Sequence, residues 1–309
     1  MTGSVEMESV LVHFLLLLAL PPLLLGVIQK TKAWCGGRKG APVLQPYYDL
    51  VRLFRKEVVL SRTTSWIFRV APVVGVVAIG LAGALAPFGA SAAPLRFTGD
   101  LVLFAYLFGL ARFFITAAAL DTGSSFEGMG AAREVTFACL AEPALFLAFV
   151  VLIRLSGSLS LTPMLHAPIV HDFHGLPTAS LWLVAVGLFV VLLAENSRIP
   201  VDDPNTHLEL TMIHEVMVLD HSGPLLGLVL YGAALKLLVL SALLVPLLLP
   251  VRFGDPLLDG GVFVAGLVGL AVAIGGVESV MARLRLQHVP SLLIAAGVLC
   301  TFSFFLTLA

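Results

Sequence analysis

The chain has 309 residues, of which 59% are hydrophobic and 12% charged, with a mean hydropathy of +1.03 and a formal net charge of −1. A soluble protein of this length could not bury so much apolar surface, so the surroundings of the folded chain are largely lipid. The small net charge provides no field that would attract nucleic acid, and Cys35, Cys139 and Cys300 are too few and too scattered for an iron–sulfur cluster or a zinc site.

Eight apolar segments are long enough for a helix to cross the hydrocarbon layer, which takes about 20 residues. β-Strands are disfavoured because the strands of a lipid-facing barrel alternate polar and apolar residues, and these segments do not. The opening residues "MTGSVEMES" contain two glutamates and no lysine or arginine, so we expect a retained first helix rather than a cleaved signal peptide. The sequence therefore predicts one all-α membrane domain over residues 1–309, with spans at about 8–29, 66–88, 99–120, 134–155, 178–196, 224–249, 260–278 and 290–308.

The lysines and arginines fall mostly on one side of these spans. Thirteen of the eighteen lie in or beside the odd-numbered loops, three lie on the opposite side, and Arg112 and Lys236 lie inside spans. Cytoplasmic loops are enriched in lysine and arginine. We therefore expect the odd-numbered loops to face the cytoplasm and both termini to face outward.

The first of these loops contains "LQPYYDLVRLFRKEVVL", Leu44 to Leu60. At 100° per residue its apolar side chains share one arc, and Asp49, Arg52 and neighbouring basic residues share the other. This pattern predicts an amphipathic helix at the membrane surface. A solvated basic face and a docking surface for another protein are equally compatible with it.

A second polar stretch, "AENSRIPVDDPNTHLELTMIHEVMVLDHSG", runs from Ala194 to Gly223. Asp203 followed by Pro204 resembles the start of a helix, which we expect to reach about Asp220. On that helix Glu209 and Asp220 would lie within an apolar face, where desolvation raises the pKa of a carboxyl group toward neutrality. The alternative is a wet loop with loosely paired charges.

Four charged residues are expected inside the spans or at their ends: Arg112, Glu142, Glu195 and Lys236. A charge near the bilayer centre costs about 2.5–3.5 kcal/mol on insertion scales, so such residues usually pair inside the protein or line a polar path. Both uses remain open from the sequence, ion pairing for assembly and a proton pathway. A polar chain toward the cytoplasmic surface could be continued by Glu127, Arg133, Glu134 and Glu278.

Metal and nucleotide motifs are weak or missing. His171 and His174 form an HxxH pattern with His166 nearby, but no acidic ligand stands at helical spacing, which favours a wet loop over a metal site. The sequence "HEVMV" at His214 lacks the second histidine of a zinc protease motif, and there is no Walker loop, nucleophile elbow or GxGxxG fingerprint.

Three ordered motifs resemble the proton-coupling subunit shared by respiratory complex I (its subunit 1) and the membrane-bound [NiFe] hydrogenases. "ENSRIPVDDP…HLEL…SG" resembles the loop between the fifth and sixth membrane helices of that family, "GRKGAPVLQPYYDLVRLFRKE" its first cytoplasmic loop, and "REVTFACLAEPALFL" the segment around its fourth helix. Asn205, His207 and Ala233 stand where complex I sequences have glutamates, and "THLELTMIHE" with "LKLL" is closer to the formate hydrogenlyase subunit 4 and hydrogenase-4 component C branch.

The resemblance implies a membrane-anchoring, proton-coupling subunit of a hydrogenase-type respiratory complex, non-catalytic itself and without a redox centre or cofactor of its own. The nickel–iron site and iron–sulfur clusters are expected in partners, namely the hydrogenase large and small subunits and an iron–sulfur subunit, with antiporter-like subunits beside this chain in the membrane. The alternatives are a quinone-site subunit of a complex I type oxidoreductase and, more remotely, a stand-alone secondary transporter, although no internal repeat supports the latter. The expected proton relay is Glu134, Glu142, Glu195, Glu209, Asp220, Lys236 and Arg112, and the expected docking residues for the peripheral arm are Arg198, Asp202, Asp203, Asp49, Arg52 and Arg133.

Overall fold

The structure is a computed structural model that describes residues 2–166, 176–202, 212–250 and 253–308. Within these ranges it contains eight helices that are long and apolar enough to cross a membrane, and no strand. These helices are α1 (Thr2–Cys35), α3 (Trp66–Leu85), α4 (Asp100–Asp121), α5 (Ser125–Ser156), α8 (Leu176–Glu195), α10 (Gly223–Leu248), α11 (Pro256–Val280) and α12 (Val289–Leu306). Shorter helices are α2 (Gln45–Phe54), α6 (Leu161–Leu165), α9 (His214–Met217) and the 3₁₀ turn η1 (Leu286–His288).

The all-α membrane fold is therefore confirmed, and each expected span coincides with one long helix. Helix α1 extends six residues beyond the expected span 8–29 at both ends, and the start of α5 also differs. Helix α5 begins at Ser125, nine residues before the expected 134. Gly123, with a φ of 71°, and the extended Ser124 turn the chain directly from α4 into α5. This early start adds Glu127 to the first turn of a membrane helix, where its side chain is fully buried.

The loops between the long helices gather at two ends of the bundle. We use the term charged end for the end formed by residues 36–65, 122–124, 196–202, 212–222 and 281–288. Its loops are joined by hydrogen bonds from Leu284 N to Pro200 O, at 2.9 Å, and from Val59 N to Ser222 Oγ, at 2.9 Å. At the opposite end the Asp100 carboxylate accepts a hydrogen bond from Ser160 Oγ at 2.6 Å.

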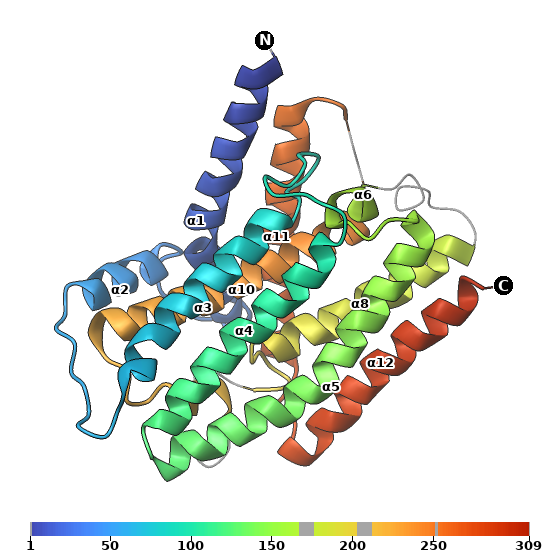
Figure 1. Cartoon of the computed structure of the whole chain (residues 1–309). Helices are drawn as coiled ribbons and strands as arrows, with labels where there is room; N and C mark the ends of the chain where they lie inside the picture. The colour runs from blue at the N-terminus through green and yellow to red at the C-terminus, as the bar shows by residue number, and fades with distance from the viewer. Residues whose placement is uncertain (1, 167–175, 203–211, 251–252, 309) are drawn as a thin grey trace.

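Helix α10 is the central helix of the bundle. It packs against α1, α3, α8 and α11. In its most apolar stretch of 18 residues, 67% of the residues are buried, the largest share among the eight spans. Small residues permit close approaches elsewhere: a Cβ added to Gly187 would lie 2.5 Å from Cys300 Sγ of α12. Figure 1 shows α3, α4 and α5 side by side, and the N-terminal half of α1 projecting beyond most of the bundle.

The amphipathic helix of the first loop is present as α2, but it ends at Phe54 rather than continuing to Leu60. It contains no buried residue and lies beside α1 and α10 (Figure 1). Tyr48 and Val51 remain exposed on it. An exposed apolar face at the end of a membrane bundle is typical of a helix at the membrane interface.

The long helix expected from Pro204 to Asp220 is wrong in its described part. Met212 and Ile213 are not helical, α9 covers only His214–Met217, and a turn follows to Asp220. The reason is a tertiary contact, because Asp202 Oδ2 accepts a hydrogen bond from Ile213 N at 2.8 Å. A side-chain acceptor of this kind gives the backbone an alternative to helical hydrogen bonds.

Candidate functional site

The most connected group of charges surrounds Arg112, near the middle of α4. Its guanidinium lies 2.6 Å from Glu195 Oε1 and 3.7 Å from Glu134 Oε1, and it also pairs with Glu142. Lys236 Nζ of α10 lies 2.7 Å from Glu195 Oε2. Four membrane helices thus contribute to one network of two cations and three carboxylates.

The members of this network differ in exposure. The side chain of Glu195 is 5% exposed and that of Arg112 is 10% exposed, whereas 41% of the Glu142 side chain is exposed. Glu195 is held by two cations because it is the last residue of α8, where the helix end lies between α4 and α10. Glu142 instead reaches the outer surface of the bundle.

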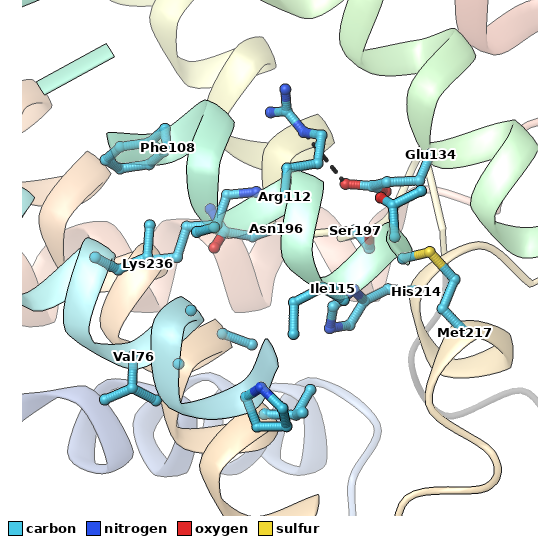
Figure 2. A pocket seen from close by; sticks show the side chains of 18 of the residues that line it. Val76, Phe108, Arg112, Ile115, Glu134, Asn196, Ser197, His214, Met217 and Lys236 are labelled. Atoms are coloured by element: carbon cyan, nitrogen blue, oxygen red, sulfur yellow. Dashed lines mark ion pairs between the residues drawn. The ribbon is translucent and has the colours of Figure 1, made fainter. Parts of the chain in front are cut away.

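A cavity of about 80 Å³ adjoins this network. Its walls come from α3, α4, α5, α10 and the loop after α8, and Figure 2 shows the labelled side chains around it, with the Arg112–Glu134 ion pair as a dashed line. Charged atoms line one part of the cavity, and apolar side chains such as Val76 and Ile115 line another. Such a space suits a few hydrogen-bonded waters beside the charges.

A second charged group lies at the charged end. Glu278 of α11 is buried and pairs with Lys32 at 2.8 Å and with Arg198 at 3.4 Å. These residues line a larger cavity, of about 230 Å³, between α1, α2, α10 and the loop after α8. The sequence predicted Glu278 only as a possible extension of the relay. Its pairing with Lys32, far away in the chain, has no local signal in the sequence.

The expected relay residues are brought together in part. Arg112, Glu134, Glu142, Glu195 and Lys236 form the network described above. Asp220 does not belong to it: its side chain is exposed, because the chain turns at 218–220 instead of continuing as a helix. Glu209 lies outside the described residues.

Near Asp220 a different buried group appears. The Asp220 backbone N–H donates to Glu127 Oε1 at 3.0 Å, and His221 stacks on Phe68 with ring centroids 3.9 Å apart. Burial lowers the pKa of His221 to about 4, because desolvation disfavours the imidazolium. This group fastens the start of α10 to α3 and α5.

The expected docking residues are only partly at the surface. Asp202 is 1% exposed and pairs with Arg283 at 2.8 Å, so its side chain faces inward, and its role in docking stays a prediction. Arg198 is likewise turned inward toward Glu278. Asp203 lies outside the described residues.

The remaining three docking candidates are more accessible. Arg52 of α2 is exposed. Asp49 is half-buried, accepts a hydrogen bond from Gln45 Nε2 at 2.9 Å and lines the larger cavity. Arg133 is half-buried and donates to Met212 O at 2.9 Å, which ties α5 to the loop.

No group of three or more histidine, cysteine, aspartate or glutamate side chains that could hold a metal occurs among the described residues. His166 donates from Nε2 to Gly89 O at 3.0 Å. His171 and His174 lie outside the described residues, so the HxxH pattern stays untested.

Comparison with known proteins shows the family to which the chain belongs. The family model described as NADH dehydrogenase matches residues 7–309. The chain belongs to this family. Formate hydrogenlyase subunit 4 of Escherichia coli is 32% identical over 91% of the chain and 92% of its own length, and hydrogenase-4 component C of the same organism is 32% identical over 78% of the chain and 74% of its own length.

Members from complex I are also similar. A membrane subunit of the NADH-quinone oxidoreductase of Syntrophotalea carbinolica is 30% identical over 79% of the chain and 74% of its own length. A chain of the archaeal membrane-bound sulfane sulfur reductase has the same fold, with a TM-score of 0.83, 21% identity and coverage of 98% of this chain and 99% of that one. The resemblance found in the sequence motifs is confirmed, and this NADH dehydrogenase family member is a multi-pass membrane protein.

Proposed function

We propose that this chain is the membrane-anchoring, proton-coupling subunit of a membrane-bound [NiFe] hydrogenase-type respiratory complex, energy-converting or formate hydrogenlyase-like. The supporting observation is the network around Arg112, in which Lys236 and three carboxylates meet inside a membrane bundle. Ionisable groups at this depth are expensive and mark proton relays in membrane proteins. The similarity to formate hydrogenlyase subunit 4 over nine-tenths of both chains supports this branch of the family.

The partly exposed Glu142 side chain supports a neighbour in the membrane. A carboxylate in contact with lipid at mid-span would cost about 2.5–3.5 kcal/mol on insertion scales, so this surface is expected to be covered by protein. We propose that an antiporter-like membrane subunit lies against α5 at Glu142 and receives protons there. Because Arg112 contacts Glu142 and Glu195 at once, the relay can reach this surface from the interior.

The charged end would bind the peripheral arm, with its hydrogenase large and small subunits and iron–sulfur subunit, and would face the cytoplasm of a prokaryotic inner membrane. The exposed Arg52 is available for direct contact. Arg198, Asp202 and Arg133 would act by positioning the loop after α8, since each is tied to another part of the chain. The redox groups belong to the partners in this proposal, and this chain supplies ionisable side chains.

Substitution of Glu142 by glutamine tests the proposal. Glutamine keeps the size of the side chain and removes its charge and its proton, so the complex is expected to assemble and transfer electrons while redox-driven proton uptake into inverted vesicles is lost. The matched control is Glu8→Gln, an exposed glutamate on α1. Equal proton uptake by the Glu142 variant and the wild type would remove Glu142 from the path.

The larger cavity keeps one alternative open, a quinone-site subunit of the complex I type. With about 230 Å³ it is smaller than most ligand pockets, which have about 300–1,000 Å³, but it lies between α1, α2 and α10 and combines apolar and charged walls. The test measures the rate at which membranes that contain the whole complex reduce a short-chain quinone. A rate that falls when Leu53, which lines this cavity, is replaced by a bulkier residue would favour this alternative.

A further inference from the structure

The two cavities share one wall. Asn196, Ser197, His214 and Ala233 line both of them. The smaller cavity is also lined by Glu134, Glu195 and Lys236, and the larger one by Arg198, Asp202 and Glu278. The shared wall therefore stands between the two charged groups of the protein.

His214 is the one titratable side chain in this shared wall. It is the first residue of α9, directly after the bend at Ile213, and it lines the smaller cavity together with Asn196 and Ser197, which follow α8 (Figure 2). One carboxylate on each side is already paired with cations: Glu195 with Arg112 and Lys236, and Glu278 with Lys32 and Arg198. Asp49 and Glu215 also line the larger cavity.

Two polar side-chain atoms of the shared wall are available for hydrogen bonding. His214 Nε2 and Asn196 Oδ1 are both buried, and neither has a hydrogen-bond partner among the described residues. Asn196 is held in place, because its Nδ2 donates to Leu192 O at 2.8 Å. Buried polar atoms are normally satisfied by protein or by ordered water, so this position suits a water that joins the two side chains.

We propose that His214 is the proton-transfer residue that connects the two cavities. The step moves one proton and changes no bond between heavy atoms: one ring nitrogen accepts a proton from a water on one side, and the other ring nitrogen releases its proton on the opposite side. Imidazole can do this near neutral pH, whereas the other wall residues cannot. The inference rests on the proposed function, since it adds a residue to the same proton path.

Chemical rescue tests this role. Replacing His214 by glycine leaves room for a free five-membered ring, so His214→Gly is expected to lower proton uptake per electron at least tenfold in vesicles with the complete complex, driven by reduced methyl viologen. Added imidazole should restore the uptake, and pyrazole, a ring of the same shape that is not protonated near neutral pH, should not. His214→Gln retains a polar side chain and a folded loop and is expected to show the same loss.

The controls separate this inference from the proposed function. His288→Gly changes an exposed histidine at the same end of the bundle that lines neither cavity, and it should leave proton uptake unchanged. If the wild-type complex takes up no protons, the proposed function fails. If the wild-type complex takes up protons and the His214→Gln complex takes up as many, the role of His214 is overturned. It is overturned likewise if imidazole and pyrazole both restore proton uptake by the His214→Gly complex, or if neither does.

Discussion

Substitution of Arg112 by methionine should destabilise the assembled protein more than any other single loss of charge in the spans. Methionine replaces the apolar stem of the side chain and removes the cation from three carboxylates. At an effective dielectric constant of about 20, the separations of 2.6 Å to Glu195 and 3.7 Å to Glu134 correspond to about 6 and about 4 kcal/mol of Coulomb attraction. Glu195 keeps Lys236 as a partner, so the main loss falls on Glu134 and Glu142.

Desolvation and the exposure of Glu142 offset part of this attraction, and removing one partner of a buried ion pair typically costs about 3–5 kcal/mol. At about 2–4 °C for each kcal/mol, the temperature of half-inactivation of the purified complex should fall by at least about 6 °C. In the double variant Arg112→Met/Glu134→Gln, the second substitution removes a carboxylate that has lost its cation, so about 1–3 kcal/mol of stability should be recovered. The control Arg69→Met, at an exposed position on α3, should change stability by no more than about 0.5 kcal/mol. An unchanged half-inactivation temperature in Arg112→Met, or strictly additive effects in the double variant, would refute the network as a stabilising unit.

Two further predictions concern the loop after α8 and the start of α10. Asp202→Ala removes the hydrogen-bond acceptor of Ile213 N and the ion-pair partner of Arg283. The segment 197–222 should therefore be cleaved several-fold faster by added protease, as followed by mass spectrometry. An unchanged cleavage rate would show that other contacts hold the loop. Because the folded pKa of His221 is depressed from 6.5 to about 4, its neutral form contributes stability above pH 6.5 that is lost as the pH falls toward 4, by up to about 3 kcal/mol. His221→Leu should therefore flatten the dependence of half-inactivation temperature on pH between 6.5 and 4, and a wild-type slope in that variant would contradict the assignment.

Hydropathy was sufficient to predict the fold, because a span of about 20 apolar residues has few alternatives in lipid. The same reasoning predicted that Arg112, Glu142 and Lys236 would face the protein interior or a polar path. Arg112 and Lys236 are largely buried, whereas 41% of the Glu142 side chain is exposed. It could not predict which carboxylate meets which cation. Arg112 and Glu195 are 83 positions apart, and their pairing depends on how four helices pack.

The expected helix from Pro204 to Asp220 failed for another reason. It was inferred from local capping, whereas the docking role of Asp202 was implied by the family resemblance. In the structure Asp202 is used by Ile213 and by Arg283, which belongs to the loop before α12. Tertiary contacts of this kind override local propensity, and a single sequence gives no signal for them.

Four consecutive residues at the end of α8 link the two charged groups of the protein. Glu195 pairs with Arg112 and Lys236, Asn196 and Ser197 line both cavities, and Arg198 pairs with Glu278. Because the chain between Glu195 and Arg198 contains only two residues, a shift of the loop by more than a hydrogen-bond length would lengthen at least one of these ion pairs. A partner that moved the loop at the charged end would therefore change the charge environment at Glu195 without touching it, which is the physical requirement for coupling between two distant sites.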